Sequence, residues 1–338
     1  MTFVDEVKTA VTVRAALLVI GVLGLMVAFI ASYAGAFHSP KPKDIPFAVV
    51  APPQIAGQLA QKLNALPGSP LDVRTAKDEA AATRQLRDRS VDGVLVVDPR
   101  GTTDTLLVAS GGGASLSQAV ELVATAAEKA QQRTVKVVDV APADRDDARG
   151  LSSFYLVVGW CVGGYLCAAI LAISAGARPA NPHRALIRLG ALAAYSIAAG
   201  LLGSLIIGPV LGALPGSYLG LAGLGALVVF AVGATTLAFQ GLAGVVGIGL
   251  AILVIVVLGN PSAGGAYPYP LLPPFWRTIG PGLPPGAGTW AARSIAYFKG
   301  NSIGGPLQVL SVWALFGAVI TVILAGLRRD RSETPADA

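Results

Sequence analysis

One stretch of the sequence has the pattern of a nucleophile elbow. Gly300-Asn301-Ser302-Ile303-Gly304 matches Gly-x-Ser-x-Gly, in which a serine on a sharp turn attacks an acyl group. That chemistry needs a strand before the serine, a helix after it, and histidine and acidic partners. The chain has only two histidines, His38 and His183, and glycine-rich sequence surrounds Ser302. We therefore interpret the match as coincidental, and a hydrolase is disfavoured.

Phosphate and metal chemistry also lack their usual residue patterns. No Gly-x4-Gly-Lys-Ser/Thr sequence occurs, so the chain is not expected to hydrolyse ATP by that route. Gly111-Gly112-Gly113 lacks a following Gly-Lys-Ser/Thr, and a flexible loop is favoured over a phosphate cradle. Cys161 and Cys167 lie in one apolar segment, which disfavours a disulfide framework or a cysteine metal site. We expect a protein that is not an enzyme and binds no metal or cofactor itself.

Charged side chains are missing from the apolar part of the chain. Transporters driven by protons or sodium usually place Asp, Glu, His or Lys inside the bilayer. Four windows, residues 15–40, 150–177, 189–276 and 300–327, contain no Asp, Glu, Lys or Arg. Energy for any transport is therefore expected from a partner or a downhill gradient. The few polar side chains that could line a path are Ser204, Thr235, Thr236 and Gln240.

The same windows are the elements that must position any site. Of 338 residues, 54% are hydrophobic and 13% are charged, whereas soluble domains are about 25% charged. Because a spanning helix needs roughly 20 apolar residues, the four windows hold about one, one, three and one spans. The sequence thus predicts an α-helical polytopic membrane protein with six transmembrane helices. A small α/β extracytoplasmic domain is expected between the first and second helices.

Basic residues orient these spans. The leader 1–14 reads as a cytoplasmic amphipathic helix, and the tail 328–338 also carries arginines, so both termini are expected in the cytoplasm. A cleaved signal peptide is the alternative for the first span, 15–36, because Ala34-Gly35-Ala36 resembles a cleavage site. The 17-residue apolar run Ala15–Ala31 is longer than a usual signal core and favours a retained helix. The later spans are expected over 154–175, 189–210, 218–239, 242–258 and 306–327.

The segment 37–150 differs in composition from the spans. It contains 14 basic and 14 acidic residues, as a soluble domain would. Its strand and helix periodicities alternate, which favours a partly parallel sheet. Strands are expected over 45–50, 71–75, 91–97, 105–109 and 135–140, and helices over 54–66, 77–89 and 116–133.

The loop 259–305, within the membrane domain 151–327, is rich in proline, glycine and aromatic residues. Eight prolines and ten glycines exclude one continuous spanning helix. Its aromatic residues are of the type found at the headgroup boundary. Two interpretations stay open, a re-entrant or interfacial lid over the outer mouth and an inert aromatic belt. Trp276, Arg277 and Trp290 are the candidates for an outer gate.

The loop 177–188 is the only substantial cytoplasmic loop expected between spans. It carries Arg178, His183, Arg184 and Arg188, and Asn181-Pro182 has the pattern of a helix start. These charges either anchor the topology by the positive-inside rule or form a docking helix for a cytoplasmic ATPase.

Several motifs bear on this choice. Asp147–Tyr155 runs into Gly159-Trp160 and Gly163–Leu166, and Leu272-Pro-Pro-Phe-Trp-Arg277 is followed by Leu283–Gly288 and Arg293–Phe298. Together with the order of the spans, these motifs resemble permeases of the ABC-2 transporter type, in the six-span group of the phage infection protein (YhgE/Pip) family. The resemblance implies a homodimer, or a pair with a second permease, in the bacterial cell membrane. It also implies partner ABC ATPase subunits that bind ATP and magnesium, dock on the leader and loop 177–188, and drive export of a lipophilic or amphipathic substrate.

A receptor is the second hypothesis. The chain would then be a membrane-anchored receptor or envelope-organising protein whose outer domain binds a ligand. Five further glycine-rich spans disfavour it, because one span would anchor the domain. The net charge of +6 does not indicate nucleic-acid binding, since the basic residues mark helix ends and do not form a groove.

Overall fold

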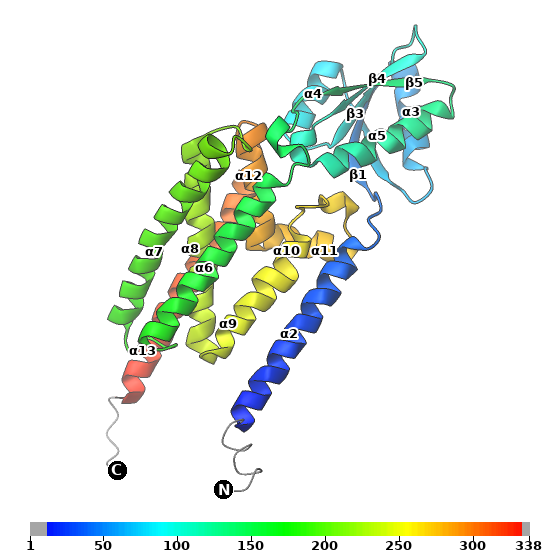
Figure 1. Cartoon of the computed structure of the whole chain (residues 1–338). Coiled ribbons are helices and arrows are strands. Elements are labelled where there is room, and N and C mark those ends of the chain that lie inside the picture. The colour runs from blue at the N-terminus through cyan, green and yellow to red at the C-terminus, as the bar shows by residue number, and fades with distance from the viewer. Residues whose placement is uncertain (1–11, 333–338) are drawn as a thin grey trace.

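The computed structural model describes residues 12–332, with side chains described to Leu327. The chain is mainly helical and consists of an α/β domain above a helical bundle (Figure 1). Five described helices are long and apolar enough to cross a membrane, which confirms a polytopic membrane protein. The first residues of helix α2 and the last residues of α13 lie at the bundle end far from the domain (Figure 1). We call these the terminus end and the domain end.

The α/β domain is one mixed sheet in the order β2-β1-β3-β4-β5. All neighbouring strands are parallel except β3 and β4, as the alternating periodicities predicted. Successive residues of β1 alternate between two buried clusters, Phe47 in one and Ala48 in the other, because helices cover both faces. The elements are β1 (Ile45–Val50), α3 (Pro53–Asn64), β2 (Leu71–Thr75), α4 (Glu79–Arg87), β3 (Gly93–Val96), β4 (Thr103–Val108), α5 (Ala114–Lys129) and β5 (Thr134–Asp139).

The bundle contains the apolar helices. The five long ones are α2 (Val13–Phe37), α6 (Ser152–Ala175), α7 (Pro182–Leu205) with its π-helical extension η3 (Ile206–Val210), α8 (Tyr218–Ala243) and α13 (Gly304–Ser332). A shorter apolar helix follows α8 as α9 (Val246–Ala251), the π-helical segment η4 (Ile252–Gly259) and α10 (Asn260–Ser262). Gly244, with a φ of 62°, separates it from α8, so α8 is longer and the next helix starts later than predicted. Residues 1–11 of the predicted leader and residues 333–338 of the predicted tail lie outside the described residues.

Helix α8 forms the centre of the bundle, and 78% of its apolar window is buried. It packs against α6, α7 and α13. A Cβ at Gly164 of α6 would lie 2.7 Å from the Val229 carbonyl oxygen, and one at Gly233 would lie 2.5 Å from Leu192. Glycines at these positions therefore let the backbones approach closely, as small residues do in membrane bundles. In contrast, only 6% of the window in α2 is buried, and α2 contacts mainly η4 and α10.

The loop 259–305 folds into short helices at the domain end. They are η5 (Tyr269–Leu271), α11 (Pro274–Ile279), η6 (Gly280–Gly282) and α12 (Pro284–Tyr297). Helix α12 packs against α6, α8 and α13, and a Cβ at Gly288 would lie 2.7 Å from Val157 of α6. Its 14 residues span about 21 Å, less than the roughly 30 Å of a bilayer core. A helix too short to cross the bilayer core thus lies among the spans below the domain (Figure 1).

Candidate functional site

The domain and the bundle meet at a joint of two arginines, the partly buried Arg89 and the buried Arg293. Arg89 follows α4 in the left-handed region, with a φ of 55°, and its guanidinium lies over two rings of the bundle. The guanidinium carbon is 3.5 Å from the centroid of Trp290 and 4.9 Å from that of Phe298. The same group, which is partly buried, donates to the Trp290 carbonyl and to Ser294 Oγ, each at 2.8 Å. Burial, and then the charge of Arg293, lower the pKa of Arg89 to about 9, so it stays charged at neutral pH.

Arg293 of α12 is the second member of the joint and is only 3% exposed. Its guanidinium donates to the carbonyls of Gly264 at 2.7 Å, Gly265 at 2.8 Å and Gly150 at 3.0 Å. One side chain thereby ties α12 to the preceding loop and to the segment that leads from the domain into α6. In the sequence, Arg293 belongs to the motif Arg293–Phe298 but was not predicted as a site residue. The available signal was that loop 259–305 holds only three charged residues, Arg277, Arg293 and Lys299.

The glycine motifs also belong to this joint. Gly111 lies so close to α12 that a Cβ there would be 2.5 Å from the ring of Tyr297. Tyr297 in turn donates to Asp147, which accepts a second bond from the amide of Ser152 at the start of α6. In the Gly-x-Ser-x-Gly stretch, Ser302 Oγ donates to the Asp88 carbonyl at 2.6 Å. Both motifs therefore connect the domain to the bundle.

Trp290 also borders a cavity of about 700 Å³ between α12 and the first turns of α13. Its ring stacks on Tyr269, with centroids 6.1 Å apart and planes at 11°. The indole nitrogen donates to the Ser302 carbonyl at 3.2 Å. Most of the lining is apolar, apart from a few groups such as Gln308 and Ser302. We call this cavity the α12–α13 pocket.

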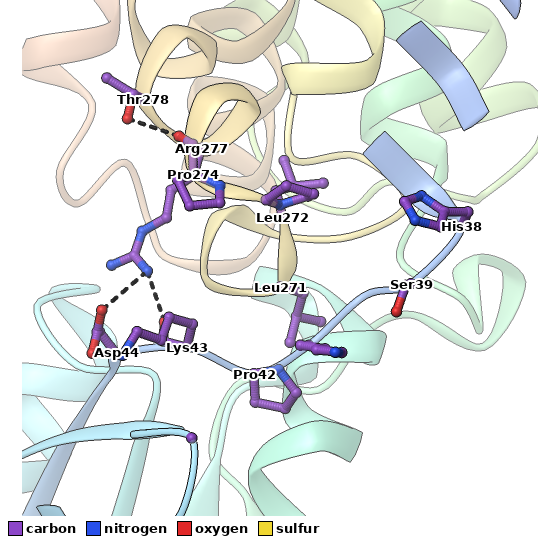
Figure 2. Close-up of a pocket in the computed structure, with 13 residues that line it drawn as sticks. His38, Ser39, Pro42, Lys43, Asp44, Leu271, Leu272, Pro274, Arg277 and Thr278 are labelled. Carbon is purple, nitrogen blue, oxygen red and sulfur yellow. Dashed lines mark hydrogen bonds and ion pairs between the residues drawn. The ribbon is translucent and has the colours of Figure 1, made fainter. Parts of the chain in front are cut away.

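Trp276 and Arg277 lie on α11, and Arg277 lines a different cavity of about 650 Å³ (Figure 2). This cavity separates the linker His38–Asp44 from the segment Leu271–Thr278, and we call it the linker pocket. Arg277 donates to the Lys43 carbonyl at 2.8 Å and lies 3.7 Å from the Asp44 carboxylate. The Trp276 indole lies near Gly35 of α2. The three predicted outer-gate residues thus share the domain end, but Arg277 lines the linker pocket, Trp290 lines the α12–α13 pocket, and Trp276 borders neither.

The predicted path residues lie within helix contacts of the bundle. Thr235 donates to the Trp313 carbonyl at 3.3 Å, and Gln240 donates to the Ala168 carbonyl at 3.2 Å. Thr236 donates to the Val232 carbonyl of its own helix at 2.8 Å. The buried Ser204 hydroxyl has no hydrogen-bond partner among the described residues. In a single chain, three of these side chains therefore bond the backbone inside the bundle, and their role along a path stays a prediction.

The predicted docking residues divide into two pairs at the terminus end. Arg188 is 6% exposed and donates to the Ala175 carbonyl at 2.6 Å, and Arg178 donates to the Leu242 carbonyl at 3.1 Å. These bonds hold the loop between α6 and α7 against the helix ends. His183 and Arg184 are exposed in the first turn of α7, which Asn181 caps through the Arg184 amide. Two of the four residues are thus free to meet a partner.

Within residues 12–332, no group of three or more His, Cys, Asp or Glu side chains is placed to hold a metal ion. Comparison with protein-family models, curated proteins and solved structures gives no match for this chain.

Proposed function

We propose that this protein is the permease subunit of an ABC-2 type exporter in the bacterial cell membrane. It would move a lipophilic or amphipathic substrate toward the domain side, using ATP hydrolysed by a separate subunit. The proposal includes a sixth span, α9 to α10, whose 17 residues cover about 25 Å and fit a slightly thinned bilayer. It places the terminus end in the cytoplasm, because Arg14, Arg178 and Arg184 lie there.

The short helix α12, which does not cross the bilayer core, is the observation that carries the proposal. A helix that ends at membrane depth exposes backbone groups, which are tolerated only where protein or a water-filled cavity receives them. Transporters use such interrupted helices beside their substrate paths. Here α12 lies among α6, α8 and α13, next to the open α12–α13 pocket. A domain anchor would need neither the helix nor the pocket.

The two ends of the bundle differ as expected for a transporter that an ATPase drives from the cytoplasmic side. At the terminus end, Arg184 presents positive charge next to the exposed His183 on a capped helix start, which supports docking of an ATPase. Helix α2 stands apart with a largely exposed apolar surface, which supports pairing with a second copy or a second permease. Movement of the bundle would reach the domain through the joint of Arg89 and Arg293.

Isolation of the full chain from its native membrane tests the proposal. We expect a Walker-A ATPase to co-purify, and its ATPase activity in proteoliposomes to rise when the permease is present. Arg184→Glu should abolish this stimulation without unfolding the bundle, because the Arg184 side chain makes no hydrogen bond or ion pair with any described residue. Arg100→Glu, an exposed reversal on the domain, is the matched control. A chain that isolates alone and stimulates no ATPase contradicts the proposal.

A ligand-binding receptor is the second candidate, and one cavity in the domain favours it. This cavity of about 250 Å³ is bordered by Asp104, Glu128 and Arg133. Arg133 donates to Asp104 at 2.6 Å and lies 3.6 Å from the buried Glu128 Oε2, which has this ion pair but no hydrogen-bond partner among the described residues. Substitution of Glu128 by Ala should abolish signalling in a receptor, whereas it should leave ATPase stimulation unchanged in a permease.

A further inference from the structure

The linker pocket carries an excess of positive charge. Lys41, Lys43 and Arg277 face a single carboxylate, Asp44, which leaves two more positive than negative charges. Arg277 and Lys43 both reach Asp44, at 3.7 and 3.4 Å, so this carboxylate is shared (Figure 2). Lys41 is exposed and has no ion pair or hydrogen bond with any described residue. The pocket is therefore suited to bind an anion.

The pocket lies where the apolar surface of α2 ends. Helix α2 runs to Phe37, and His38 caps it by contacting the Ala34 carbonyl at 2.9 Å. The first residues of the linker border the pocket directly beyond that point. On the other side, Pro274 and Arg277 of α11 line the pocket. Between them in sequence, Phe275 is 57% exposed and packs edge-on against Trp276, with centroids 5.0 Å apart. Exposed aromatic residues next to charged ones mark the headgroup level of a bilayer.

The walls of the pocket are apolar as well as charged. Leu271, Leu272, Pro42, Pro273 and Pro274 border the same cavity. Earlier in α2, large apolar side chains are exposed as far as Ile30, including Met26 and Phe29. A ligand with an anionic head and apolar chains would therefore find both of its parts accommodated, whereas a soluble anion would use only the charged part.

We infer that the linker pocket binds the phosphate headgroup of an anionic phospholipid in the leaflet on the domain side. Lys41, Lys43 and Arg277 receive the phosphate, and the acyl chains lie along α2. A phosphate oxygen accepts charge-assisted hydrogen bonds from ammonium and guanidinium groups. Basic residues close to a membrane surface also attract anionic lipid headgroups. This site does not depend on transport, because a bound lipid would equally fix α2 relative to α11 in a receptor.

Native mass spectrometry of the full chain in detergent tests the site. Palmitoyl-oleoyl phosphatidylglycerol, the corresponding phosphatidylcholine and inorganic phosphate are titrated in parallel. We expect phosphatidylglycerol to bind at least tenfold more tightly than phosphatidylcholine. Lys41→Gln/Lys43→Gln should remove most of this difference while keeping the backbone bonds of the linker. Lys41→Arg/Lys43→Arg should retain it, because the charge is kept.

Matched variants separate a pocket from general surface charge. Arg84→Gln/Lys136→Gln removes two exposed charges from the domain and should leave phosphatidylglycerol binding unchanged. Equal loss in this control, or equal binding of the two lipids by the unmodified chain, overturns the inference. Competition by inorganic phosphate at the concentration of the lipid also overturns it, because the pocket would then be a site for soluble anions.

Discussion

Replacing Arg293 with Met should disconnect α12 from the domain side of the protein. The substitution keeps an apolar stem of similar length but removes the three bonds to Gly264, Gly265 and Gly150. Each charged hydrogen bond contributes about 1.5–3 kcal/mol, and the desolvation cost of the buried guanidinium offsets part of that sum. Breaking a buried charged network typically costs about 3–5 kcal/mol, which we expect here.

Thermal unfolding in detergent measures the effect. Cys161 is 1% exposed, so a thiol-reactive dye reports when the bundle opens. At about 2–4 °C per kcal/mol, the unfolding midpoint should fall by roughly 6–20 °C. Arg178→Met is the control, because this exposed arginine makes one bond of 3.1 Å to the Leu242 carbonyl. Its loss should cost about 1 kcal/mol or less.

If the unfolding midpoint of Arg293→Met equals that of Arg178→Met, the three bonds do not hold the joint. Hydrogen exchange gives an independent view of the same point. Amides around residues 264–265 and 150–152 should exchange faster in Arg293→Met, while those in the centre of α8 should not change below the melting temperature.

Three other positions, Gly200, Glu128 and Arg89, allow separate tests. Gly200→Val should destabilise the bundle by more than about 2 kcal/mol, because its side chain would collide with the Ala222 carbonyl of α8. Gly190→Val on the same helix meets open space, so its unfolding midpoint should equal that of the unmodified chain. Burial, and then the neighbouring Asp104, raise the pKa of Glu128 from 4.5 to about 7, so the contribution of Glu128 to stability is fully present below pH 4.5 and falls by at most about 3 kcal/mol as pH rises through 7. Denaturant titrations at pH 5 and 8 should show this loss, and Glu128→Gln should remove it. Arg89→Met should free the turn after α4 from α12, with faster hydrogen exchange around residues 88–90 and unchanged exchange at β5. Unchanged exchange in this turn would contradict the cation–π contact as the link.

The local properties of the chain were readable from its sequence. The charge-free windows predicted every long apolar helix, because the need for about 20 apolar residues per span is met within one segment. All five strands and three helices of the domain occur close to their predicted bounds, since hydrophobic periodicity reflects burial on one face or two. The fifth predicted span differs most, because Gly244 interrupts the helix at a position where the apolar run continues.

Partner choice, in contrast, was decided only by the tertiary structure. Arg89 meets Trp290 from 201 residues away, and Arg293 meets Gly150 from 143 residues away. Nothing in the neighbouring sequence of either arginine specifies these contacts. Similarly, four basic residues of loop 177–188 look equivalent in sequence, yet Arg188 is buried against a helix end while Arg184 is exposed. The sequence determined which segments enter the membrane, since transfer from water to lipid depends on the composition of each segment. The fold decided which charges hold the structure together and which stay free, because a buried charge is stable only where distant parts of the chain supply its hydrogen-bond partners.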